Sequence, residues 1–317
     1  MSIHDGKRQS TAVAYLHPAA KRENLTIQTQ AHTRRLLIEG QRCVGVEYRH
    51  NGSLTQARAN AEVIVCAGAI DSPRLLLLSG IGDADQLRAA GVEVVHHLPG
   101  VGQNLHDHPL LCMVVEAAQA IPPGNNNHAE VSMLWRSRPG LAGPDMQFMF
   151  IHLPFHPPAL QAPELAYTFG ISTIPTSRGS IRLASADPDQ APLIDPNYLG
   201  AAEDVKRLMI GIERARELID TSALAKWSKG EVHINGVNDE AGLRDFIARA
   251  TNTYYHPVGS CKMGTGEMAV VDPELKVHGL SGLRVADASI IPTIVCVNTN
   301  PASIMIGEKA AGLIRGN

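Results

Sequence analysis

AEVIVCAGAIDSPRLLLLSGIG, residues 61–82, joins a short apolar run to a second apolar segment through a turn of small and polar residues. The run from Val63 to Cys66 is continuously apolar, which is typical of a strand buried on both faces. In the turn, Ser72 is a suitable N-cap, and Pro73 suits the first position of a helix that ends at Gly80. The stretch therefore predicts a strand, a tight turn and a helix, a unit that often lines a ligand site where a parallel sheet ends.

The residues before this unit predict a small β-meander. TRRLLIE (33–39), CVGVEYR (43–49) and SLTQARA (53–59) have the composition of strands. Asn51 and Gly52 separate the last two, and this dipeptide is the strongest short hairpin signal.

The composition is that of a folded protein with a sizeable core. The chain has 317 residues, of which 44% are hydrophobic and 19% charged, and its net charge of −3 predicts no nucleic-acid partner. Five scattered cysteines favour a reducing, cytoplasmic location over a disulfide framework. The N-terminus, MSIHDGKRQS, is too polar for a signal peptide, and no apolar run is long enough to predict a transmembrane segment.

The middle of the chain has a different character. The segments 125–137, 144–156 and 165–185 contain short alternating or apolar strands between proline-rich loops. Residues 201–220 and 239–250 have apolar side chains at helical spacing. We expect an antiparallel sheet flanked by helices.

The stretch TYYHPVGSCKMG, residues 253–264, places a histidine at a rigid point of the backbone. Pro257 disfavours a helical conformation at His256, and the two glycines allow close backbone approach. Beyond it, residues 282–292 predict a short strand and a turn. A helix then runs from Asn300 and Pro301 to Gly316, with Asn300 as its N-cap.

Five motifs in this order resemble the glucose–methanol–choline (GMC) family of flavin-dependent alcohol oxidoreductases. They are AGAIDSPRLLLLSGIG (67–82), LPGVGQNLHDHP (98–109), SRGSIRLASADP (177–188), YHPVGSCKMG (255–264) and ADASIIPTIVCVNTNPASIMIGEKAA (286–311). The resemblance covers essentially the whole chain. It implies a protein that oxidises an alcohol to an aldehyde or ketone with FAD, by proton abstraction and hydride transfer to flavin N5.

The resemblance also implies a fold of the α/β and α+β classes, with an incomplete FAD/NAD(P)-binding-type domain and a substrate domain. Residues 1–105 would form part of the FAD-binding domain, with the meander, the strand and the helix. Residues 106–250 would form the substrate-binding domain around the antiparallel sheet. Residues 251–317 would carry the catalytic histidine loop and return to the FAD-binding domain.

The resemblance assigns the proton transfer to one histidine. His256 matches the family's base-bearing motif, and a positioned imidazole that removes the alcohol proton contributes about 10²–10⁴-fold to the rate. Asn298, six positions after Pro292, matches the residue that holds the substrate oxygen. Its amide donates to a developing alkoxide but is no base, so His256 is the only proton acceptor of the pair. A structural histidine and a turn-forming asparagine are the alternatives.

Six further residues match the family's cofactor contacts. Ala67 and Gly68 are small where the predicted strand ends, and Asp287 and Ala288 belong to the ADAS segment that contacts the cofactor's middle. Asn300 and Pro301 begin a helix whose N-terminus would stabilise the anionic reduced flavin. Ordinary capping of a core helix is the alternative, and both roles are compatible.

Other features do not predict a site. The histidines at 96, 97, 106 and 108, with Asp107, have no zinc-ligand spacing, so we expect no metal. Ser260 and Cys261 lie near His256, but the sequence has no G-x-S-x-G elbow that would indicate acyl transfer.

The dinucleotide-binding fingerprint of the family is absent from the sequence. GVGQNL (100–105) has only two of the glycines of G-x-G-x-x-G and precedes no apolar helix. We expect either a truncated or split reading frame or one half of a two-chain enzyme, whose partner supplies the missing FAD-binding segment. The strand at 63–66 would then lack neighbours and have an open edge. The sequence leaves open which alcohol is bound, which electron acceptor is used, and whether the chain is a hydroxynitrile-lyase-like enzyme or an inactive fragment.

Overall fold

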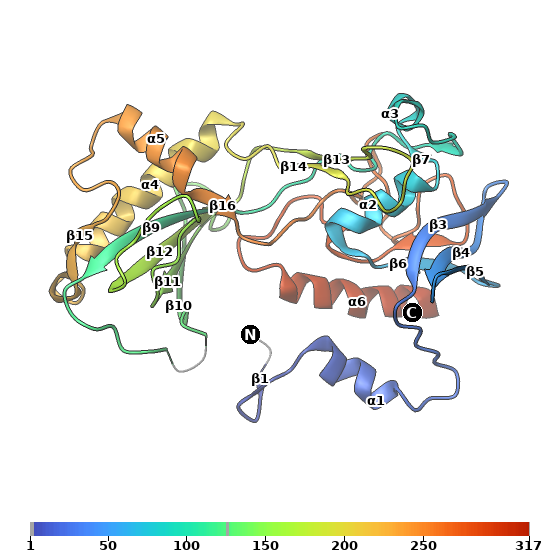
Figure 1. Ribbon diagram of the computed structural model, residues 1–317, viewed down its shortest axis with the longest axis horizontal. Coiled ribbons are helices and arrows are strands. Elements are labelled where there is room, and N and C mark those ends of the chain that lie inside the picture. Colours follow the sequence, from blue (N-terminus) through green and yellow to red (C-terminus); the bar gives the residue numbers. More distant parts are fainter. Residues whose placement is uncertain (1–2, 125–126, 317) are drawn as a thin grey trace.

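The computed structural model describes residues 3–124 and 127–316 (Figure 1). The start of the segment predicted as a strand at 125–137, and the outermost residues of the first and last predicted domains, lie outside the described residues. The described chain forms two regions with separate hydrophobic cores. The first region has its core in residues 36–101 and 258–310, and the second region in residues 111–250. The boundaries of the three predicted domains stay a prediction.

The meander predicted before the strand–turn–helix unit is confirmed. It consists of β3 (His32–Glu39), β4 (Arg42–His50) and β5 (Ser53–Arg58), paired in that order and antiparallel. The tip between β4 and β5 is formed by Asn51 and Gly52, both with positive φ. The hairpin dipeptide therefore has the conformation that its sequence favours.

The strand and helix of residues 61–82 are present, but two details were predicted wrongly. Strand β6 (Val63–Val65) pairs in parallel with β17 (Leu283–Val285), its single strand partner among the described residues, and Ile64 is 39% exposed, so β6 is not buried on both faces. Helix α2 (Gly68–Leu78) begins four residues before Ser72, which is therefore not its N-cap.

Pro73 lies inside α2 instead of at its start, and a side chain from the histidine loop compensates for it. Because proline has no N–H, the carbonyl of Ala69, four residues earlier, receives no helical hydrogen bond. The hydroxyl of Ser260 donates to this carbonyl at 2.5 Å. The proline thus creates the acceptor that ties the loop of residues 253–264 to α2.

The second region is a six-stranded antiparallel sheet with two helices on one face (Figure 1). The strand order is β10 (Val131–Trp135), β11 (Met146–Ile151), β12 (Ala166–Thr173), β9 (Pro109–Ala117) and β15 (Ser228–Glu231), and β16 (Thr251–Thr253) also pairs with β9. Helices α4 (Ala202–Ile219) and α5 (Glu240–Ala250) cover one face with the apolar residues that predicted them. The other face is directed toward the histidine loop.

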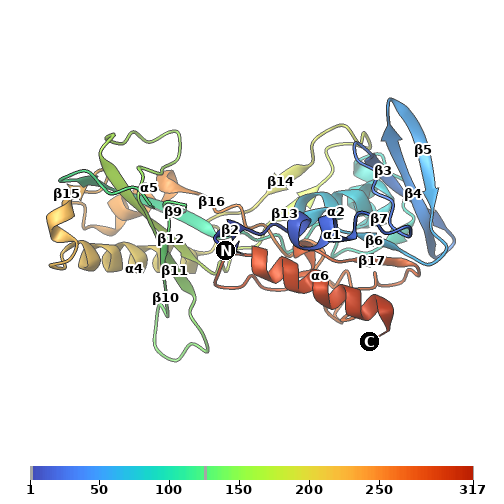
Figure 2. The same cartoon turned by 90° about the horizontal axis from the view of Figure 1, so that it is seen from below.

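The remaining elements complete the first region and an N-terminal arm. The region includes β7 (Ile81–Gly82), α3 (Ala84–Ala89), β8 (His96–His97), β13 (Ser180–Arg182), β14 (Leu193–Asp195) and α6 (Asn300–Arg315). The arm carries β1 (Ile3–His4), β2 (Lys7–Arg8), a π-helical turn at Ala12–Leu16 and α1 (His17–Ala19). Figure 2 shows α6 along the lower side of the molecule, where the hydroxyl of Tyr15 in the arm donates to Glu308.

The start of α6 differs from the prediction by one residue. Thr299 precedes the helix, and Asn300 is its first residue instead of its N-cap, with no side-chain cap among the described residues. The predicted end is confirmed, because Gly316 adopts a left-handed conformation after Arg315. None of the described helices is long and apolar enough to cross a membrane.

Candidate active site

The backbone around His256 is held in an unusual conformation by a close contact with residues 104–106. Strand β16 ends at Thr253, and Tyr255 has a φ of +59°, which is uncommon for an aromatic residue. Gly259 has a φ of +90°, and a Cβ there would lie 2.6 Å from both the Asn104 carbonyl oxygen and a ring carbon of His106. The first glycine after His256 is therefore required by backbone approach, as its sequence predicts.

Asp107 anchors the histidine loop through three hydrogen bonds to its buried carboxylate. One oxygen accepts the backbone N–H of His256 at 2.9 Å. The other accepts the hydroxyls of Tyr198 and Thr253, each at 2.5 Å. These bonds engage both carboxylate oxygens and fix the position of His256 relative to β9 and β16. The aspartate of the LHDHP motif is thus a loop anchor, a function that sequence reasoning missed.

The His256 ring is 9% exposed and has a partner at each nitrogen. Its Nδ1 lies 3.0 Å from Nδ1 of His108, and its Nε2 lies 3.2 Å from Nδ2 of Asn298. The ring of Tyr254 packs against it at a centroid distance of 4.3 Å. Burial lowers the pKa of His256 below its ordinary value, and the charge of Asp107 opposes this shift. The imidazole is therefore neutral at physiological pH and has the protonation state of a base.

Asn298 lies at the exposed side of this cluster, in the segment that leads to α6. Its Oδ1 is 3.5 Å from Nε2 of Gln147, a residue of β11 on the open face of the second region's sheet. The structure thus brings together His256 and Asn298, which are 42 residues apart in sequence. The contact of Gln147 joins both regions at this point.

Ala67, Gly68 and Asp287 also lie together, at the end of β6. One oxygen of the Asp287 carboxylate accepts the backbone N–H of Gly68 at 2.9 Å and the hydroxyl of Ser72 at 2.5 Å. Ala67 is exposed, and Gly68 has a φ of +84° with no described atom within 4 Å of the position that a Cβ would occupy. Ala288 is half-buried and accepts a hydrogen bond from the backbone of Gly259 through its carbonyl. These residues form an open rim next to the histidine loop.

The first residues of α6 are also accessible to solvent. Asn300 and Pro301 are both exposed. Because the helix start has no side-chain cap among the described residues, its first N–H groups are available to an anion. We call the residues Ala67, Gly68, Asp287, Ala288, Asn300 and Pro301 the cofactor rim, after their predicted role, which stays a prediction.

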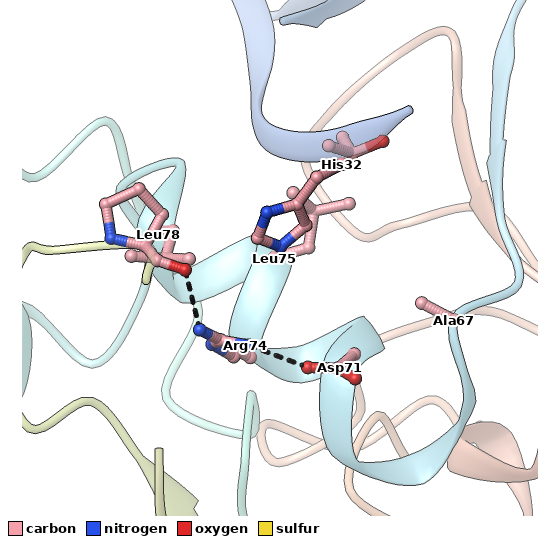
Figure 3. Close-up of a pocket in the computed structure, with 8 residues that line it drawn as sticks. His32, Ala67, Asp71, Arg74, Leu75 and Leu78 are labelled. Carbon is pink, nitrogen blue, oxygen red and sulfur yellow. Dashed lines mark hydrogen bonds and ion pairs between the residues drawn. The ribbon is translucent and has the colours of Figure 1, made fainter. Parts of the chain in front are cut away.

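A cavity of about 250 Å³ opens beside Ala67, along α2 (Figure 3). The side chain of Arg74 lies in its wall, where it donates to Asp71 at 3.0 Å and to the carbonyl of Pro188 at 2.7 Å. Its Nε is buried and has no partner among the described residues. The sequence did not indicate this cavity, because His32 and Pro188, two of its lining residues, come from distant parts of the chain.

Two of the histidines noted in the sequence, His96 and His106, make contacts that hold the fold together. His96 contacts the backbone carbonyl of residue 278, and His106 lies between the carbonyl of Asn104 and the N–H of Ile294. Burial lowers the pKa of His106 to about 4. In the described part of the chain no three His, Cys, Asp or Glu side chains are grouped so that they could hold a metal ion.

Two family models match the chain. Both are described as GMC oxidoreductase; the N-terminal model matches residues 1–110 and the C-terminal model matches residues 175–307. Together they cover well over half of the chain. The chain belongs to the GMC oxidoreductase family.

Relatives and solved structures agree with this assignment. The chain is 40% identical to mitochondrial choline dehydrogenase of Homo sapiens, which it matches over 100% of its own length and 58% of the relative. It is 39% identical to choline oxidase of Arthrobacter globiformis, with 98% of the chain and 59% of the relative covered. It superimposes on pyridoxine 4-oxidase from Mesorbium loti with a TM-score of 0.95 and 34% identity, over 99% of the chain and 63% of that structure.

These comparisons confirm the predicted family and fold class, including the relation to the FAD-binding fold of GMC flavoenzymes. The GMC chain spans about three fifths of the length of these relatives.

Proposed function

We propose that this chain supplies the base and one side of the flavin site of a FAD-dependent alcohol oxidoreductase. The observation that carries the proposal is the 3.2 Å distance between His256 Nε2 and Asn298 Nδ2 at the exposed side of a buried cluster. A basic nitrogen and an amide donor at this spacing bind the two sides of one hydroxyl group. Few other arrangements suit proton removal from an alcohol so directly.

The cofactor rim fits a flavin dinucleotide. The absence of a side chain at Gly68 allows close approach, and the exposed Ala67 adds little bulk. The uncapped start of α6 offers N–H groups and a partial positive charge to an anionic ring. When bound, FAD supplies the acceptor for the carbinol hydride.

The residues of this chain account for the proton. The substrate hydroxyl donates its proton to His256 Nε2, while the amide of Asn298 donates a hydrogen bond to the same oxygen and stabilises its developing negative charge. The charge of Asp107 stabilises the imidazolium that results. The ring packing of Tyr254 excludes water from one side of the base.

The nature of the alcohol is left open by the described residues. Human choline dehydrogenase and Arthrobacter choline oxidase are named for a cationic substrate. Among the described residues, the carboxylate that contacts the His256 loop is that of Asp107, and its oxygens already accept three hydrogen bonds from the protein. Because Asp107 is buried and bonded to the loop, a quaternary ammonium group would need a further carboxylate or an aromatic ring for direct contact.

We also propose that the missing dinucleotide-binding segment completes the sheet at the open edge of β6. The support is the exposure of Ile64 and the single pairing of β6, with β17, among the described strands. The segment comes either from the same polypeptide or from a second chain.

A cytoplasmic location is consistent with the absence of disulfides among the five cysteines, all within the described residues.

The test uses the assembled enzyme, which we define as this chain together with a strand–GxGxxG–helix segment of a GMC relative, loaded with FAD. Anaerobic addition of primary alcohols, with choline and pyridoxine among them, should bleach the oxidised flavin absorbance. A flavin that binds and stays oxidised with every alcohol would overturn the proposal, and cyanohydrin cleavage under those conditions would favour the lyase alternative. A colourless preparation after FAD is offered would favour an inactive fragment.

A further inference from the structure

We infer that His108 is a positioning residue that fixes the tautomer of His256, so that the lone pair of His256 is on Nε2, where the alcohol binds. The inference rests on the proposed function for its purpose but not for its geometry. It follows from a series of hydrogen bonds whose direction is set at the carbonyl of Phe148.

The contact between the two histidines joins one nitrogen of each ring. His108 Nδ1 faces His256 Nδ1 at 3.0 Å. Because neither ring nitrogen of this pair can donate to another donor, one of them carries a hydrogen and the other holds a lone pair. If His256 Nε2 holds the lone pair, then His256 donates from Nδ1 and His108 Nδ1 accepts, since a neutral imidazole has one N–H.

The carbonyl of Phe148 sets the direction of these hydrogen bonds. The hydroxyl of Ser132 donates its only hydrogen to this oxygen at 2.9 Å, so Ser132 accepts the 3.2 Å hydrogen bond from Gln147. This requires the NH₂ group of Gln147 on that side of its amide. The same group is 3.5 Å from Asn298 Oδ1, which turns the NH₂ group of Asn298 toward His256 Nε2.

The amide donor of Asn298 assigns a lone pair to His256 Nε2, so His256 donates from Nδ1 to His108. The reversed direction would place two facing acceptors between Gln147 and Ser132, whereas the direction described leaves Gln147 Oε1 without a partner among the described residues. His108 and Gln147 are nearly completely buried, so water cannot compensate for such contacts. The hydrogen bonds therefore run in the direction in which His256 donates from Nδ1 to His108.

His108 is also suited to remain an acceptor throughout proton transfer. Burial, and next the charge on His256, lower the pKa of His108 to about 3. His108 therefore stays neutral when His256 gains a proton at Nε2, and its Nδ1 continues to accept the N–H from His256 Nδ1. It orients the base without competing for the substrate's proton.

The experiment measures the tautomer directly in the 317-residue chain labelled with ¹⁵N-histidine, above the ordinary pKa of histidine and without flavin or substrate. Long-range ¹H–¹⁵N spectra distinguish the protonated nitrogen from the one with a lone pair, and His256→Gln assigns the signals. We expect His256 with a protonated Nδ1 and a lone pair on Nε2, and His108 with the opposite pattern. A protonated Nε2 on His256 would overturn the inference.

Two substitutions separate positioning from packing. His108→Asn keeps an acceptor oxygen at the place of Nδ1, so the His256 tautomer should be retained. His108→Leu keeps apolar volume but no acceptor, so His256 should populate the Nε2–H tautomer. An unchanged tautomer in the leucine variant would contradict the inference. If that variant does not fold, the wild-type and asparagine spectra still decide.

A control and a separate readout complete the test. His97→Asn replaces an exposed histidine that accepts a hydrogen bond from Ala84, and it should leave the His256 signals unchanged. Because the spectra need no catalysis, a failure of the tautomer assignment is distinguishable from a failure of the proposed function. In the assembled enzyme, His108→Leu should lower the rate of flavin reduction at least tenfold and His108→Asn should restore most of it.

Discussion

The surroundings of His256 and the cofactor rim are two neighbouring parts of one site, and they differ in how far this chain completes them. The backbone N–H and both ring nitrogens of His256 have partners within the described residues. At the rim, Ala67, Asn300 and Pro301 are exposed, and Gly68 faces open space. The comparison indicates that the part proposed to accept the proton has its contacts within the described residues, whereas the part proposed to face the flavin is open.

The largest expected effect is the loss of the base. In the assembled enzyme, His256→Ala should slow flavin reduction by about 10²–10⁴-fold, because general-base catalysis contributes this much. Stopped-flow absorbance of the flavin measures the rate. The variant should bind FAD as the wild type does, since the rim residues are unchanged. A near-normal rate would mean that His256 is not the base. The distinction between a proton-accepting part and a flavin-binding part would then be wrong.

The next effect tests whether the buried histidines next to the base are part of the folded core. Burial lowers the pKa of His106 to about 4, whereas a histidine in the unfolded chain titrates near about 6.5. Between these values the unfolded state binds the proton that the folded state does not. The stabilisation is complete above about pH 6.5 and is lost as the pH falls, by about 3 kcal/mol from this residue.

Urea unfolding of the chain between about pH 7 and about pH 4 measures this loss. Replacing the titrating group by His106→Gln should reduce the pH dependence of the unfolding free energy, whatever its effect at neutral pH. An identical pH dependence in both proteins would mean that His106 is solvated, and the compact picture of the base cluster would be wrong.

The smallest effect compares two glycines with nearly equal φ values, one in each part of the site. Gly259→Ala adds a Cβ that would lie 2.6 Å from the Asn104 carbonyl oxygen, whereas Gly68→Ala adds one in open space. Both variants have the strain of a left-handed residue, but only the first has a steric clash. We expect Gly259→Ala to lower the unfolding free energy by about 2 kcal/mol more than Gly68→Ala.

Denaturant unfolding of the two variants measures this difference. FAD binding to the assembled enzyme is measured for the same two substitutions. Gly68→Ala should weaken FAD binding although it is the less destabilising substitution. Equal losses of stability, together with unchanged FAD binding, would contradict the division between a completed and an open part.

The sequence predicted the parts of the fold that depend on local pattern. The meander follows from alternating strands and the Asn51–Gly52 turn, and α6 ends at Gly316, as expected. The pair of His256 and Asn298 was reached through the resemblance and not through local chemistry, since 42 residues separate them. Their roles stay predictions, although the structure brings them together.

The errors arose where a residue's role depends on a distant contact. Ser72 was assigned to the helix start because Pro73 disfavours a helix interior, but the Ser260 hydroxyl compensates for the missing N–H from 187 positions away. The strand Val63–Cys66 has the composition of a doubly buried strand, but Ile64 is exposed among the described residues and β6 pairs there only with β17. Strand β9 was not predicted, although a continuous apolar run of its kind is compatible with a buried strand.

The roles of Asp107 and His108 were missed for the same reason. The LHDHP motif was noted as part of the family motif at 98–109 and for a histidine spacing that excludes zinc, with no role assigned to Asp107 or His108. Its contacts with the loop of His256 span about 150 residues, and no local pattern reports them. A charged residue between two histidines in a run that then turns apolar is the one signal that could have suggested a buried polar anchor.

The most direct test of the central claim is the position of a bound alcohol in a structure of the assembled enzyme with a substrate analogue. The account predicts that the carbinol oxygen lies within about 2.6–3.2 Å of both His256 Nε2 and Asn298 Nδ2. A carbinol oxygen bound away from this pair, or a His256 ring whose Nε2 faces away from it, would contradict the account.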